Sequence, residues 1–137
     1  MCINSLILKV TTTPATILAG GILPLTTIAR RRGRLITSEN DSISLNAPGY
    51  YKVTVTVTAS GSEAGDIVLN VLKNGIEIPG LTASETITTA TTELRTLTIS
   101  GTVRVLCGEG SAVLTLVNAS TIGITTSNIS VAVEYLD

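Results

Sequence analysis

The sequence lacks several residue types on which common protein functions depend. Its 137 residues include no histidine, no phenylalanine and no tryptophan. Without histidine, Ser-His-Asp and Cys-His catalysis, histidine metal sites and the usual general base near neutral pH are excluded. We therefore expect a protein that is not an enzyme and that carries no cofactor.

Ion-binding and redox motifs are also sparse. Glu63 and Asp66 lie in one glycine-rich loop and could bind calcium through carboxylate oxygens, but such a pair more often belongs to a solvated loop. Cys2 and Cys107 have no metal-ligating neighbours, and we interpret them as buried or free thiols. No metal site is predicted.

Charged residues are scarce. They make up 14% of the chain, and the mean hydropathy is +0.48. Such values indicate either a membrane protein or a subunit whose apolar surface is covered by its neighbours. The uncharged stretch 11–29 could span a bilayer as a helix, but Pro14, Pro24 and Gly20-Gly21 would make it a poor one. We favour the covered subunit and expect no membrane contact.

The β-branched residues threonine, valine and isoleucine are abundant in the chain, and they favour strands. Threonine accounts for about one residue in six, well above its usual share. The segment 51–58 alternates strictly, so Val53, Val55 and Val57 share one face and the threonines share the other. Asn74-Gly75 predicts a hairpin turn. Short strands separated by Gly, Asn and Ser predict an all-β sandwich or barrel.

The first quarter of the chain differs from the rest. Prolines and glycines interrupt residues 1–34, which we interpret as an extended N-terminal arm before a single β-domain at 35–137. The arm ends in a basic cluster within an otherwise acidic chain, formed by Arg30, Arg31, Arg32 and Arg34. The cluster could bind an acidic partner or a neighbouring subunit, or could be a solvated turn. Nucleic acid is disfavoured, because no aromatic side chains lie nearby to stack on bases.

Several short motifs resemble one known superfamily. The segment 45–53, LNAPGYYKV, is similar to the "apolar-x-x-x-Gly-x-Tyr-x-Val" strand of the tumour necrosis factor and complement globular-head superfamily. Leu72–Gly75 resembles its Asn-Gly hairpin, and Thr98–Gly101 and Asn128–Leu136 resemble its late strands. The likeness covers about residues 40–137. The chain differs from the family in having no collagen-like repeats and in lacking most of the aromatic residues found at the trimer axis of many members.

The resemblance implies a jelly-roll β-sandwich assembled as a homotrimer. Members of the superfamily include bacterial spore-surface glycoproteins and bacteriophage head fibres and decoration proteins. We accordingly predict a structural virion protein on the particle surface, a head fibre or capsid decoration module. The arm and its four arginines would contact the major capsid protein or another virion protein. The trimer core is predicted to consist of Tyr51, Val53, Val55, Val57, Val131 and Val133.

Two alternatives remain open at this point. One is a glycan-binding module for host adhesion, on a phage tail or a bacterial surface. Its weakness is that the sequence offers few aromatic side chains to stack on sugar rings. The other is an immunoglobulin-like sandwich that decorates a surface as a monomer.

Overall fold

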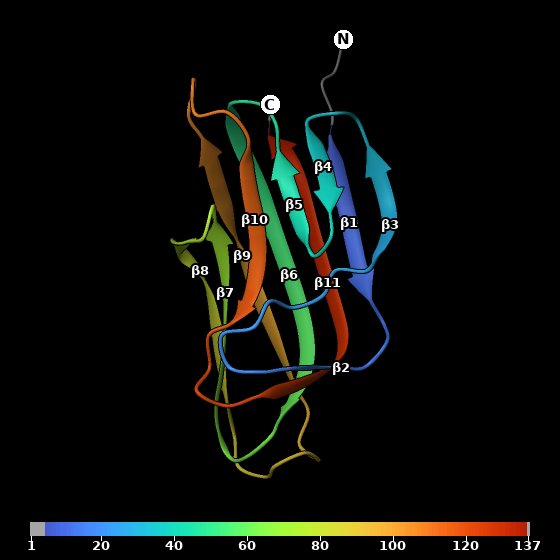
Figure 1. Cartoon of the computed structure of the whole chain (residues 1–137), viewed down its shortest axis with the longest axis vertical. Coiled ribbons are helices and arrows are strands. Elements are labelled where there is room, and N and C mark those ends of the chain that lie inside the picture. Colours follow the sequence, from blue (N-terminus) through green and yellow to red (C-terminus); the bar gives the residue numbers. More distant parts are fainter. Residues whose placement is uncertain (1–4, 137) are drawn as a thin grey trace.

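The chain folds as two antiparallel β-sheets packed face to face (Figure 1). The computed structural model describes residues 5–136, within which eleven strands and no helix occur. The all-β sandwich predicted from the sequence is confirmed. The strands are β1 (Leu6–Thr11), β2 (Ala15–Ile17), β3 (Thr27–Arg32), β4 (Ile36–Glu39), β5 (Ser42–Leu45), β6 (Gly49–Gly61), β7 (Gly65–Lys73), β8 (Ile76–Ile87), β9 (Arg95–Val105), β10 (Ala112–Asn118) and β11 (Ile124–Leu136).

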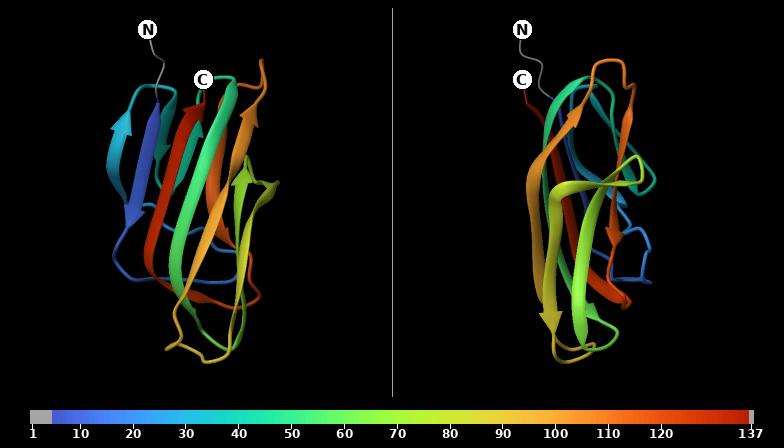
Figure 2. Two further views of the ribbon diagram at one scale, coloured as in Figure 1. Left: turned by 180° about the vertical axis from the view of Figure 1, so that it is seen from behind. Right: turned by 90° about the vertical axis from the view of Figure 1, so that its left-hand side faces the viewer.

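Each sheet draws on strands from both halves of the chain. Sheet A has the order β3-β1-β11-β6-β9, and β2 adds a sixth strand beside β11. Sheet B has the order β4-β5-β10-β7-β8. Seen from the side, the sheets form two separate layers (Figure 2). Strands β3 and β4 therefore form one flank of the sandwich, and β8 and β9 form the other.

The core is aliphatic because alternation turns the branched side chains inward. Val53, Val55 and Val57 of β6 are at most 1% exposed, and they meet leucines and isoleucines of sheet B. Tyr51 is the one aromatic side chain that is fully buried among the described residues. Its hydroxyl donates to Ala47 O at 2.6 Å and accepts from Ala47 N at 3.2 Å. The ring also contacts Tyr135 edge-on, with the ring centroids 5.2 Å apart.

The predicted Asn-Gly hairpin is confirmed between β7 and β8. Asn74 and Gly75 have φ angles of 52° and 82°, the left-handed values that a two-residue hairpin turn requires. Asn74 Oδ1 also accepts a hydrogen bond from Val113 N at 2.9 Å, which ties the turn to β10.

The expected boundary at residue 34 is wrong, because residues 6–32 build part of sheet A. Strand β1 lies between β3 and β11, with Leu6 opposite Glu134 and Thr11 opposite Ile129. Its inward face enters the core, where Ile7 is fully buried and Lys9 is 3% exposed. The N-terminal segment is thus a structural strand pair of the sandwich, and the described residues contain no separate arm.

Polar contacts bind this segment to sheet B. Lys9 Nζ crosses the sandwich and donates to Glu39 O at 2.9 Å. Burial lowers the pKa of Lys9 below its ordinary value, and the nearby Asp41 carboxylate partly offsets that shift. Asp41 Oδ1 accepts from Leu25 N at 3.0 Å, and Leu23 N donates to Leu116 O at 2.8 Å.

The uncharged stretch 11–29 contains β2 and a crossing segment that pairs with β10. Within residues 5–136 we find no helix with the length and apolar character needed to span a membrane. Asn118 anchors the crossing segment: its buried amide donates to Ile17 O at 3.2 Å and to Ile122 O at 3.0 Å. The prolines and glycines of this stretch therefore lie in an ordered segment that crosses from sheet A to sheet B.

Candidate assembly surface

The outer face of sheet A is an extended surface of small hydroxyl and aliphatic side chains. On β6, the alternation that buries the valines turns Thr54, Thr56 and Thr58 outward, and each is half-buried by its neighbours. We call the part of this face between β1 and β9 the hydroxyl face. It is formed by Leu8, Val10, Thr54, Thr56, Thr58, Thr96, Thr98, Ser100, Ser130 and Ala132.

The register aligns these side chains in rows across four strands. Thr56 lies opposite Thr98 on one side and Ser130 on the other, and Ser130 lies opposite Val10. The next row begins with Ser100, opposite Thr54. Thr58 Oγ1 and Thr96 Oγ1 lie 3.2 Å apart and share a hydrogen bond. These rows therefore carry hydroxyl and aliphatic side chains and no charged ones.

Charge is confined to the border of the hydroxyl face. Lys52 and Glu134 lie directly opposite one another in the row beyond Thr54. Arg104 lies at the end of β9, and Arg30 is opposite Leu8 on the β3 side. Covering charged groups costs far more free energy than covering hydroxyls that can bond to each other. This face can therefore be covered at low cost by another protein surface.

The predicted trimer core requires correction. Tyr51, Val53, Val55, Val57, Val131 and Val133 are between 0 and 5% exposed in the single chain. They face sheet B and pack in the sandwich core, so no second copy can contact them. The alternation of β6 and β11 correctly separates two faces, but the valine face is the internal one. The threonine face of the same strands is the one that remains open.

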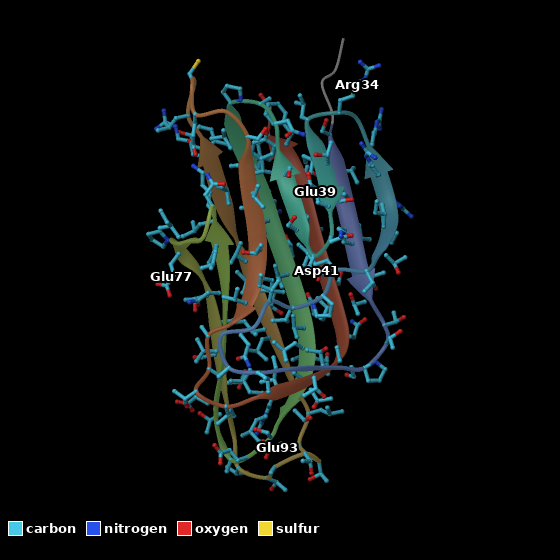
Figure 3. The ribbon with its side chains drawn as sticks, viewed as in Figure 1. Arg34, Glu39, Asp41, Glu77 and Glu93 are labelled. Atoms are coloured by element: carbon cyan, nitrogen blue, oxygen red, sulfur yellow. The ribbon has the colours of Figure 1, made fainter. Side chains whose placement is uncertain are left out.

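The four arginines lie at the edge of sheet A. Every side chain of β3 is exposed, and Arg34 follows in the exposed turn after it (Figure 3). Arg30 and Arg32 lie opposite Leu8 and Leu6 and so share the outer face of the sheet, whereas Arg31 lies opposite Ile7 and points the other way. In the part of the chain that the structure describes, the ion pairs are Lys73–Glu109 and Arg95–Glu93, so none involves these four arginines.

A row of unpaired arginines has two physical consequences. An edge strand exposes unpaired backbone groups, and positive charge discourages other strands from adding to it. The guanidinium groups also retain their capacity to bind carboxylates in pairs of parallel hydrogen bonds. The arginine edge, Arg30–Arg32 with Arg34, is thus suited to an acidic protein surface.

Among residues 5–136, the structure shows no cluster of side chains that could hold a metal ion. No group of three or more acidic or cysteine side chains converges there. Asp66 Oδ1 accepts a hydrogen bond from Thr86 Oγ1 at 2.8 Å, across the β7–β8 pair. Cys107 is an exposed thiol in the loop after β9, and Cys2 lies outside the described residues.

Solved structures with the same fold come from animals and from a bacteriophage. Murine APRIL matches with a TM-score of 0.71 at 12% identity, covering 97% of this chain and 99% of that one. The globular domain of zebrafish complement 1qA matches with a TM-score of 0.68 at 8% identity, covering 96% of both chains. The PRD1 vertex protein P5 matches with a TM-score of 0.59 at 16% identity over the full length of both chains.

These matches confirm the predicted fold: the chain is a jelly roll of the tumour necrosis factor and complement globular-head type. The immunoglobulin-like sandwich is not its fold. Identities of this size relate the folds alone. No protein-family model and no curated protein matches the sequence.

Proposed function

We propose that this chain is a structural module of a virus particle, a head fibre or capsid decoration protein that acts as a homotrimer on the particle surface. The hydroxyl face is the observation that carries the proposal. It is a surface without charged side chains on a fold shared with the PRD1 vertex protein. A scaffold of this kind supplies rigidity and repetition, and it needs no reacting groups.

A three-fold assembly requires two different patches on each copy, because contacts around the axis run head to tail. The hydroxyl face offers two distinct halves. Its β1 half is aliphatic, with Leu8 and Val10, and its β9 half is hydroxylated, with Thr96 and Thr98. We place the aliphatic half of each copy against the hydroxylated half of the next, so that all three hydroxyl faces turn toward the axis.

The arginine edge lies beside the hydroxyl face and remains available for attachment. We assign it the contact to an acidic surface of the major capsid protein or another virion protein. Removing residues 1–34 would not test this contact, because it would also remove β1 from sheet A. Reversing the charges of Arg30, Arg31 and Arg32 changes the exposed edge and leaves the strand pairing in place.

Sedimentation velocity of purified protein tests the trimer. The wild-type chain should sediment as a trimer at micromolar concentration, and Thr56→Glu, which places a charge at the centre of the hydroxyl face, should yield monomers. The matched control is Thr115→Glu, the same change at a half-buried position on the outer face of sheet B. A wild-type monomer, or equal behaviour of the two variants, would contradict the proposed assembly.

Particle occupancy tests the attachment. Virions should carry the wild-type trimer and lose most of it when the three β3 arginines are replaced by glutamate, while the variant still sediments as a trimer. Quantitative mass spectrometry of purified particles measures this. Undiminished occupancy of the variant would show that the arginine edge is not the contact.

A further inference from the structure

The outer edge of β3 carries backbone groups that have no strand partner among residues 5–136. Sheet A ends at this strand, which pairs on its other side with β1, and each of its six residues is exposed. A strand in an antiparallel sheet points alternate pairs of N–H and C=O groups to its two sides, so part of those in β3 point away from β1. Such an edge is a template for another extended segment.

The three arginines of β3 point to both faces of sheet A. Arg30 and Arg32 share the outer face, and Arg31, opposite the buried Ile7, is on the inner side. A folded surface laid on the outer face would therefore miss Arg31. One that met all three arginines edge-on would cover the outward N–H and C=O groups of β3 without bonding to them, which is costly. A strand added beside β3 bonds to these groups and places one side chain opposite each arginine.

Charge decides which segment can add at this edge. The arginines repel a second copy of β3 and any other basic strand. They form no ion pair within residues 5–136, so their guanidinium groups can pair with carboxylates. Strand β4 is the edge of sheet B on the same flank, and Glu39 is its one charged side chain. An acidic strand is therefore attracted to β3 and repelled by β4.

A hollow of about 590 Å³ lies beside the first half of β3. Leu25 and Ile28 line it from one side, and Glu39 and Asp41 line it from the β4–β5 hairpin (Figure 3). Ile28 is 44% exposed and lies opposite Lys9, so it points to the inner side of the sheet. Lys9 Nζ already donates to Glu39 O, and Asp41 Oδ1 accepts from Leu25 N. The two carboxylates disfavour a further acid here, so an apolar side chain suits the position opposite Ile28.

We propose that β3 binds an acidic extended segment of its attachment partner, which joins sheet A as a further antiparallel strand. The proposal rests on the attachment role given to the arginine edge under Proposed function. Glutamate or aspartate residues of the segment lie opposite Arg30, Arg31 and Arg32, and an apolar residue lies opposite Ile28. The main-chain hydrogen bonds supply the affinity, and the side-chain pattern selects the partner.

Fluorescence anisotropy with the whole chain and a labelled peptide, SEEETVTS, tests the added strand. In antiparallel register this peptide places its three glutamates opposite the arginines and its valine opposite Ile28. It should bind at low ionic strength, and SQQQTVTS should bind at least about tenfold more weakly, since charged hydrogen bonds are lost. Two further peptides carry N-methyl groups on the amides of the odd-numbered or the even-numbered residues. One of them should lose at least about tenfold in affinity and the other should retain most of it, because only alternate amides of an added strand face β3.

Arg31→Gln should weaken binding of SEEETVTS about as much as Arg30→Gln does. The matched control is Arg95→Gln, at an exposed arginine that is paired with Glu93, and it should leave the affinity unchanged. The added strand is refuted if SEEETVTS does not bind, if the two methylated peptides bind equally, or if Arg31→Gln binds as the wild type does.

Particle occupancy keeps this result separate from the proposed attachment. If the variant with glutamate at the three β3 arginines leaves the particle but SEEETVTS does not bind, the arginine edge is the contact and only the added strand is refuted. If that variant stays on the particle, the attachment itself is refuted, whatever the peptides do.

Discussion

Replacing Tyr51 with phenylalanine gives a direct measure of what fixes the turn before β6. The hydroxyl of Tyr51 makes two hydrogen bonds to one residue, donating to Ala47 O and accepting from Ala47 N. Removing the oxygen leaves both backbone groups of Ala47 without these partners, while the ring stays in the core beside Tyr135. A neutral hydrogen bond contributes about 1 kcal/mol net, and a buried polar group left without a hydrogen-bond partner costs more. The expected loss is about 1–3 kcal/mol in the free energy of unfolding.

Urea unfolding followed by circular dichroism, at one fixed protein concentration, measures this loss. Tyr50→Phe is the control, because Tyr50 is half-exposed and its hydroxyl makes no hydrogen bond within the described residues. The control should stay within about 0.5 kcal/mol of the wild type. If Tyr51→Phe is equally stable, the Ala47 contacts do not secure the turn before β6.

The difference in stability between the wild type and Tyr51→Phe should depend on pH. Burial raises the pKa of Tyr51 above its usual value of 10.0, the hydrogen bond with Ala47 opposes the rise, and the nearby Tyr135 adds to it. The unfolded chain therefore ionises first as the pH increases. The stabilisation by Tyr51 is complete below about pH 10 and is lost at higher pH. The difference between wild type and Tyr51→Phe should narrow above pH 10, and a constant difference would contradict this reasoning.

Two further substitutions test the packing of the crossing segment and of β8 against β9. Asn118→Ala removes the amide that holds Ile17 O and Ile122 O, and it should cost about 2–4 kcal/mol in unfolding free energy. The exposed Asn128→Ala should cost less than about 0.5 kcal/mol, and equal losses would refute the role of the Asn118 amide. Gly101→Val drives a side chain into Leu81 and should cost about 1–3 kcal/mol by thermal unfolding, whereas Ser84→Val at an exposed position of β8 should not. An unchanged melting temperature for Gly101→Val would show that Leu81 can shift without cost.

Local patterns predicted the strands well where alternation and turn residues agree. The alternation in 51–58 identified β6, and Asn74-Gly75 identified the turn after β7. The same alternation could not tell which face is internal. A valine face can be buried against the second sheet of its own chain or against another copy, and both give the same sequence pattern. Only the position of sheet B decided between them.

The N-terminal segment shows a second limit of prediction from local sequence patterns. Strand β1 gains its backbone partners from β3 and from β11, whose residues lie more than a hundred positions away. Local propensity is weak evidence when the stabilising partner is so distant. The prolines and glycines of 11–29 correctly predicted the absence of a helix, but they also occur in a crossover. The irregular pairing of β8 with β7 left no local signal, because Pro79-Gly80 reads as an ordinary turn.

The position of β11 has a consequence for how the protein is made. This strand follows all its neighbours in the sequence, yet it lies between β1 and β6 in the middle of sheet A. A growing chain on the ribosome cannot complete the sheet before residues 124–136 emerge, and until then the backbone edges of β1 and β6 that pair with β11 have no partner strand. Contacts of such long sequence separation form slowly. Premature termination just before β11 should therefore yield an aggregating polypeptide, since the missing strand is the one that unites the first and second parts of the sheet.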